Sequence, residues 1–138
     1  MSFVDKLTLA ARIWLTYGAV RAALRRYPLP EAVARLGVDA GRSAYPTALL
    51  SRAVSRALRI GPWRPRCLTR SLVLYRLLRA QGAPADLIIG LPSETSDWDA
   101  HAWVEIDGQD VGPVPGRYGH EELVRYPGDP SDGAKPPG

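Results

Sequence analysis

Several residue types are scarce in this sequence, and their scarcity excludes some kinds of site. The 138 residues include one cysteine and two histidines. A single cysteine cannot form an internal disulfide, and it fits a reducing compartment such as the cytoplasm. One cysteine and two histidines also fall short of the four ligands that a structural zinc site normally uses. We therefore expect a cytoplasmic protein without a disulfide framework, a metal ion or another cofactor.

Long apolar runs are missing as well. The most apolar early stretch, residues 7–23, is interrupted by Arg12 and Arg21, so it is not expected to span a membrane. It also lacks the apolar core and small-residue cleavage site of a secretory signal. The chain is 46% hydrophobic and 23% charged, which is ordinary for a globular protein. Its length suits one domain with one core.

Acidic residues are scarce in the first half of the chain. Residues 1–70 contain 13 Lys or Arg against three acids, whereas residues 71–138 contain five against eleven. A basic half can bind nucleic acid, bind an acidic partner, or simply form a solvated face. Because the arginines are spread over several predicted helices without interleaved aromatic residues, a polypeptide partner is favoured over nucleic acid.

The spacing of apolar residues predicts a helical first half. Apolar side chains recur at three- and four-residue steps over residues 4–27, the pattern of an amphipathic helix. A short helix is expected from Pro30 to Gly37, and a third helix over residues 47–58. A fourth begins at or near Cys67 and stops at residues 81–82. This last segment is apolar on more than one side, so it is expected to be the buried central helix.

The second half contains strand signals. We expect strands over residues 85–91 and 100–106, and a hairpin turn at Asp107-Gly108 that leads to a third strand from Gln109 to about residue 114. The last residues, 127–138, have almost nothing to bury, so we expect a disordered tail. The prediction is an α+β protein with a single domain over residues 1–126. Residues 1–60 form its helical half, and residues 61–126 combine the central helix with a small antiparallel sheet.

Cys67 follows a Gly/Pro/Trp break and opens the predicted central helix. A thiol in this position lies near the unpaired backbone amides of the first turn, whose partial positive charge favours the thiolate. Arg64, Arg66 and Arg70 lie nearby in the sequence and act in the same direction. The alternative is that this lone cysteine is a small buried hydrophobic residue, as many free cysteines are.

His101 lies inside a predicted strand, where its side chain has no propensity reason to be. It follows Cys67 by 34 positions and belongs to a separate element, as it must if folding is to bring a Cys/His pair together. A buried histidine that is hydrogen-bonded to the backbone is the alternative. A cysteine at the start of a helix followed by a histidine on a strand predicts a nucleophile and its base.

These residues resemble those of a known family. Residues 67–72 (CLTRSL), 77–79 (LLR), Gly82 and 100–105 (AHAWVE) are similar to the lasso-peptide leader peptidases, which are the protease component of the B-type maturation proteins. That family is part of the transglutaminase-like superfamily. The resemblance extends more weakly into the helical first half, so it covers nearly the whole chain before the tail. It implies a papain-like fold with the cysteine on a central helix and the histidine on a small antiparallel sheet.

The resemblance also implies a reaction and partners. The expected enzyme is a cysteine endopeptidase that removes the leader from a ribosomally made precursor peptide. A small recognition protein binds the leader and delivers the substrate, and an ATP-dependent cyclase, similar to asparagine synthetase, closes the macrolactam. The exposed face of the helical half is expected to bind the leader or the recognition protein. Another amidase or acyltransferase of this superfamily, and a non-catalytic peptide-binding adaptor, remain as alternatives.

The third catalytic residue does not follow the family pattern. The resemblance implies an acid about a dozen residues after His101, where this chain has a proline. Asp110 is the nearest acid on the predicted third strand and is our candidate. A two-residue turn would pair it with Glu105, about 13 Å along the strand from His101, and only a longer turn or a bulge would bring it closer. Asp107 and an acid from the loop at residues 94–99 are the alternatives.

Two tryptophans are candidates for substrate binding. Trp63 precedes the proposed nucleophile by four residues, and Trp103 lies on the same strand face as His101. Packing in the core is the alternative for both.

Overall fold

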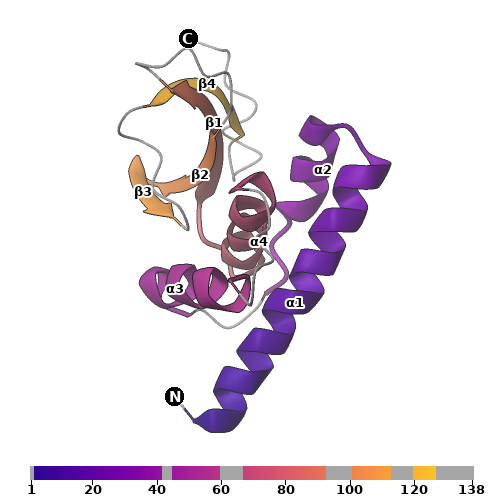
Figure 1. The fold of residues 1–138 in the computed structure, drawn as a ribbon, viewed down its shortest axis with the longest axis vertical. Coiled ribbons are helices and arrows are strands. Elements are labelled where there is room, and N and C mark those ends of the chain that lie inside the picture. The colour runs from indigo at the N-terminus through magenta and orange to yellow at the C-terminus, as the bar shows by residue number, and fades with distance from the viewer. Residues whose placement is uncertain (1, 42–44, 60–66, 93–100, 113–119, 127–138) are drawn as a thin grey trace.

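The computed structural model describes residues 2–41, 45–59, 67–92, 101–112 and 120–126, and its elements are shown in Figure 1. Four helices precede a sheet of four strands: α1 (Phe3–Arg26), α2 (Leu29–Leu36), α3 (Thr47–Ala57), α4 (Cys67–Ala80), β1 (Ala85–Pro92), β2 (His101–Ile106), β3 (Gln109–Gly112) and β4 (His120–Tyr126). The predicted α+β class, the four helices and the first three strands are confirmed. The predicted tail, residues 127–138, lies outside the described residues.

The ends of the long helices follow from local hydrogen bonding. α1 begins with a capping box, in which the Ser2 side chain accepts from the Asp5 backbone and the Asp5 carboxylate accepts from Ser2. α4 ends at Ala80, and Gly82, two residues later, has a φ of 83°. The N–H groups of Gly82 and Ala83 donate to the carbonyls of Arg79 and Leu78, a Schellman motif that a residue with a side chain would adopt less readily. The stop predicted at residues 81–82 is confirmed.

The sheet is antiparallel throughout, in the order β3-β2-β1-β4. Asp107 and Gly108, with φ values of 52° and 78°, form the predicted two-residue turn between β2 and β3. β4 was not predicted from the sequence. It pairs with β1 at the edge of the sheet and leaves Leu123 and Val124 exposed to solvent.

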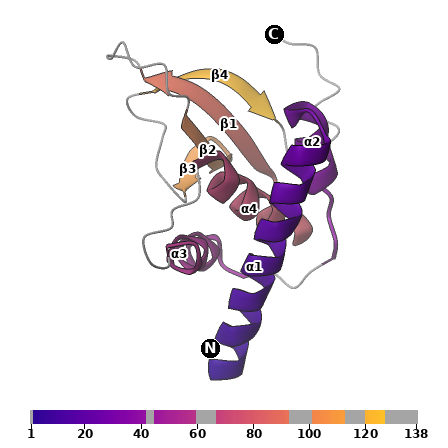
Figure 2. The same ribbon diagram turned by 45° about the vertical axis from the view of Figure 1, so that its right-hand side comes forward.

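The central position of α4 organises the core. One side of the helix packs against β1 and β2, and the other sides pack against α1, α2 and α3 (Figures 1 and 2). Leu72, Val73, Leu74 and Leu78 are therefore fully buried, although they point in different directions around the helix. The apolar character of this helix on more than one side is explained by these contacts. Within the described residues, no helix has the length and apolarity needed to cross a membrane.

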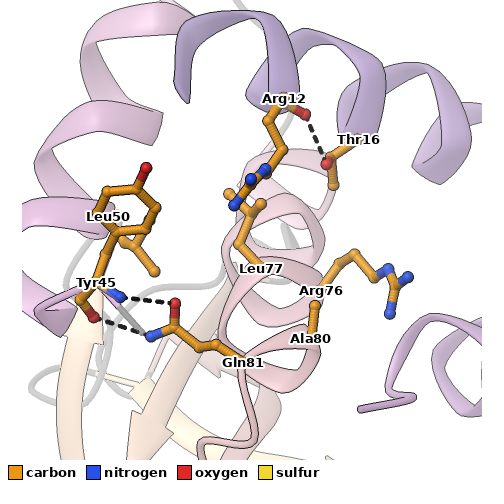
Figure 3. A pocket seen from close by; sticks show the side chains of 8 residues that line it. All are labelled: Arg12, Thr16, Tyr45, Leu50, Arg76, Leu77, Ala80 and Gln81. Atoms are coloured by element: carbon orange, nitrogen blue, oxygen red, sulfur yellow. Dashed lines mark hydrogen bonds between the residues drawn. The ribbon is translucent and has the colours of Figure 1, made fainter. Parts of the chain in front are cut away.

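A side-chain clamp joins Tyr45, two residues before α3, to Gln81, the residue after α4 (Figure 3). The Gln81 side chain accepts a hydrogen bond from the Tyr45 backbone N–H at 3.0 Å and donates one to the Tyr45 carbonyl at 2.9 Å. These bonds border a small cavity of about 60 Å³, which Arg12 and Arg76 also line. The clamp attaches the helical half to the element that carries Cys67.

Candidate active site

Cys67 and His101 come from different elements and lie next to each other. Cys67 is the first residue of α4, and His101 is the first residue of β2. A hydrogen bond joins the thiol to the imidazole, and it is the strongest of the effects that lower the pKa of Cys67. The fold thus brings together the two residues that the sequence predicts as nucleophile and base.

Backbone groups add to the stabilisation of the thiolate. Cys67 is half-buried, and burial by itself raises the pKa of the thiol. Hydrogen bonds from the backbone of Ala102 and Leu68, together with the charge of His101, act in the opposite direction. The net effect is a pKa below the ordinary value of cysteine. The lowered pKa favours the thiolate, which is the nucleophilic form of cysteine.

Ser71 connects the helix of the nucleophile to the strand of the base. It lies one turn after Cys67 and is fully buried. Its hydroxyl donates a hydrogen bond of 2.8 Å to the carbonyl of Ala102, the residue that follows His101. Because the bond is short and excluded from water, it holds the start of α4 against the start of β2.

Trp103 supports the imidazole from within the sheet. Its ring stacks on that of His101, with centroids 6.0 Å apart and an angle of 24° between the planes. Trp103 is only 2% exposed, and its indole N–H donates a 2.8 Å hydrogen bond to the carboxylate of Glu105. A residue so deeply buried presents little surface to a substrate.

Glu105 is part of a charged cluster between β1, β2 and β4. It is 2% exposed and accepts a 3.1 Å hydrogen bond from Arg125. The same guanidinium bonds to Glu122 at 2.8 Å and to Asp86 at 2.9 Å. These carboxylates, with Glu122 contributing most, raise the pKa of Arg125 above its ordinary value. The cluster fixes the carboxylate to which Trp103 is bound.

The register of β3 leaves Asp110 away from His101. Asp110 pairs with Glu105, as a two-residue turn requires. A bulge follows, because Gly112 rather than Val111 pairs with Val104, and it lies on the His101 side of Asp110. The bulge therefore does not bring Asp110 closer to His101. Instead, Oδ1 of Asp110 accepts a 2.9 Å hydrogen bond from the Gly112 backbone.

The other candidates for the third residue and for substrate binding are placed as follows. Asp107 is in the turn between β2 and β3, beyond Glu105 and therefore still farther along the strand from His101. Trp63 and the loop at residues 94–99 lie outside the described residues. Within the parts of the chain that are described, no group of three or more His, Cys, Asp or Glu side chains is arranged so that it could hold a metal ion.

Three residues of this site were not identified from the sequence: Ser71, Glu105 and Arg125. Ser71 carried a usable signal, since it is a small polar residue one helical turn after the proposed nucleophile. Glu105 carried a weaker signal, since it lies two positions after Trp103 and therefore on the same face of the predicted strand. Arg125 had none, because β4 was not predicted.

Comparison with known families identifies this fold. A model of the transglutaminase-like superfamily matches residues 7–122, which include both Cys67 and His101 and most of the chain. The chain belongs to the transglutaminase-like superfamily. Comparison with curated proteins and with solved structures gave no match. Cysteine-based catalysis is usual in this superfamily. The pairing of Cys67 with His101 agrees with that chemistry.

Proposed function

We propose that this transglutaminase-like protein is a cysteine endopeptidase that removes the leader from a lasso-peptide precursor in the cytoplasm. The observation that carries the catalytic part of this proposal is the hydrogen bond between Cys67 and His101, which lowers the pKa of the thiol. The substrate is inferred from the resemblance of residues 67–72 and 100–105 to the leader peptidases. Membership of the superfamily supports the catalytic part, since its chemistry is usually cysteine-based.

The first half of the reaction forms a thioester. His101 takes the proton of Cys67, and the thiolate attacks the carbonyl carbon of the peptide bond that follows the leader. The oxyanion accepts hydrogen bonds from unpaired backbone N–H groups in the first turn of α4. The C–N bond then breaks, and the imidazolium of His101 gives its proton to the departing amine. The freed peptide leaves with a new N-terminus, while the leader remains as an acyl group on Sγ.

The second half of the reaction releases the leader. His101 takes a proton from water, and the resulting hydroxide attacks the thioester carbonyl. The C–S bond breaks, the leader leaves with a free carboxyl group, and the imidazolium of His101 returns its proton to Sγ, which regenerates the thiol. The new amine of the other product is the group that a macrolactam cyclase requires. We therefore propose that the leader, its recognition protein and the cyclase are the partners of this enzyme.

Leader removal can be tested by mass spectrometry. A precursor from a lasso-peptide system, supplied with its recognition protein, is incubated with the wild type, Cys67→Ala, Cys67→Ser and His101→Ala. All three variants should lose cleavage by at least about 10³-fold, because the two residues act as one unit. Circular dichroism should show an intact fold. Full cleavage by Cys67→Ala would contradict the mechanism.

The same experiment separates leader removal from the alternative acyl-transfer activity. An acyltransferase would give the leader joined to an added amine, whereas a peptidase gives the free carboxylic acid. A non-catalytic adaptor would give neither product, with any variant or with the wild type.

A further inference from the structure

An apolar groove runs between α1 and α3. It has a volume of about 500 Å³, and both helices contribute residues at three- and four-residue spacing: Lys6, Leu9, Ala10 and Ile13 from α1, and Leu49, Arg52, Ala53, Arg56 and Ala57 from α3. The spacing places each set on one face of its helix. Both Figures 1 and 2 show α3 beside the N-terminal half of α1.

The floor of this groove is made of small side chains. Ala10, Ala53 and Ala57 are partly buried and leave space where longer side chains would fill it. Leu9 and Ile13 also line the groove and are buried, at 4% and 1% exposure. A pair of helices with small residues along the facing sides can accept a third apolar helix face between them.

Positive charge surrounds the opening. Lys6, Arg52 and Arg56 line the groove and are exposed. Within the described residues, the ion pairs recorded do not include any of these three cations. Asp5, the acid next to Lys6, is engaged in the cap of α1, where its carboxylate accepts from the Ser2 backbone. The groove therefore suits an occupant with acidic residues on both sides of an apolar stripe.

The apolar surface continues along α1 beyond the groove. Phe3 and Leu7 are 75% and 54% exposed, and on the helix surface they are the neighbours of Lys6 and Ala10. Together with the groove they give an apolar strip several turns long. Exposed apolar strips with polar rims are typical of interaction sites.

We propose that the groove between α1 and α3 binds an acidic amphipathic segment of the polypeptide substrate, lying on the leader side of the bond that Cys67 attacks. This inference rests on the proposed function and deepens it, because it names the surface that holds the leader. A volume of about 500 Å³ accepts a few side chains from one helix face. A separate folded partner would normally need a wider surface, about 800 Å² on each side.

A substrate that is held in the groove between α1 and α3 should react faster at Cys67. A peptide held in the groove raises the effective concentration of any group attached to it, provided that the connecting segment can reach the thiol. The gain depends on the length of that connection and needs no change in the thiolate. Docking and chemistry can therefore be measured separately.

The test uses a synthetic peptide that carries an electrophile. The peptide has about 15 residues, with leucines at helical spacing flanked by glutamates, and a C-terminal chloroacetamide on Gly/Ser linkers of increasing length. Free chloroacetamide and a scrambled peptide of the same composition are the controls. Mass spectrometry gives the rate at which Cys67 is alkylated, at low and at high salt.

The groove variant is Arg52→Glu with Arg56→Glu, and its matched control is Arg21→Glu with Arg25→Glu. Both pairs are exposed, four residues apart on a helix, and change the charge equally. For the wild type and the control, the best linker should speed alkylation on the order of 10²-fold over free chloroacetamide, and high salt should reduce the gain. The groove variant should lose most of this gain while reacting normally with free chloroacetamide.

Three outcomes would overturn the docking inference: no gain at any linker length, an equal gain with the scrambled peptide, or an equal loss in both charge variants. Binding of the peptide to the groove without faster alkylation would also overturn it, since the groove would then serve a partner separate from the substrate. A slow reaction of free chloroacetamide at neutral pH would instead count against the proposed function, whatever the peptide does.

Discussion

At the scale of single residues, the environment of Cys67 contains two opposing effects. Half-burial disfavours a charged sulfur, whereas the imidazole of His101 and the backbone of Ala102 and Leu68 stabilise it. The hydrogen bonds outweigh the effect of burial, so the pKa of the thiol is lower than that of an ordinary cysteine. A cysteine that served only to fill the core would lack such partners and would be less acidic.

Asp110 is expected to matter much less than an orienting acid would. Its carboxylate binds the backbone of Gly112 within the bulge of β3, and its register partner is Glu105. We predict that Asp110→Ala keeps the rate of leader cleavage within about tenfold of the wild type. The loss of an acid that orients the catalytic histidine costs about 10⁴-fold in a well-studied triad.

Steady-state kinetics of Asp110→Ala and Asp107→Ala, measured side by side with His101→Ala, would check this prediction. A 10⁴-fold loss in Asp110→Ala alone would mean that its carboxylate reaches the imidazole during the reaction, against the register seen here. Similar mild effects in both aspartate variants would direct the search for the third residue to the loop at residues 94–99.

At the scale of elements, the contact between α4 and β2 aligns the two reacting groups. Ser71 on the helix bonds to the carbonyl of Ala102 on the strand, so each end of this bond is close in sequence to a catalytic residue. We predict that Ser71→Ala lowers the free energy of unfolding by about 1 kcal/mol. It should also reduce kcat about tenfold with little change in KM, because misplacement of the pair affects chemistry more than binding.

Chemical denaturation and steady-state kinetics of Ser71→Ala provide the measurement. Ser51→Ala, on α3, is the control and should leave kcat unchanged. If Ser71→Ala loses stability but keeps the full kcat, the bond contributes to folding alone and the proposed alignment is wrong.

The charged cluster between β2 and β4 should show a graded response to mutation. Arg125→Met removes the cation from a buried Glu105, and we predict a loss of about 3 kcal/mol. Glu105→Gln keeps an acceptor for Trp103 and should lose about 1 kcal/mol. Glu122→Gln affects an exposed ion pair and should lose less than about 1 kcal/mol. Urea denaturation of the three variants tests this order, and equal losses would contradict it.

At the scale of the whole molecule, the features predicted from the sequence were those with strong local signals. Apolar periodicity and Pro/Gly breaks predicted the four helices, because each helix buries one face or, for α4, several. Asp107 and Gly108 predicted the hairpin because both residues tolerate a positive φ. Cys67 and His101 were predicted as a pair because Cys67 opens a predicted helix and His101 lies on a separate predicted strand.

The features that were missed depend on contacts between distant segments. β4 is an edge strand with charged and exposed residues, so it lacks the apolar alternation by which strands are recognised. The link from Trp103 through Glu105 to Arg125 could not be predicted without that strand. The groove between α1 and α3 was also unforeseen, because periodicity does not show how closely two helices pack.

The central claim is that His101 makes Cys67 a reactive thiolate, and the pH dependence of alkylation tests it most directly. The rate of iodoacetamide labelling is measured against pH for the wild type, His101→Ala and the urea-denatured chain. Because the folded-state pKa of Cys67 is lowered, the wild-type midpoint should lie below that of the denatured chain. His101→Ala should shift the midpoint upward, since the imidazole contributes most to the lowering. Equal midpoints in the wild type and His101→Ala would contradict the account.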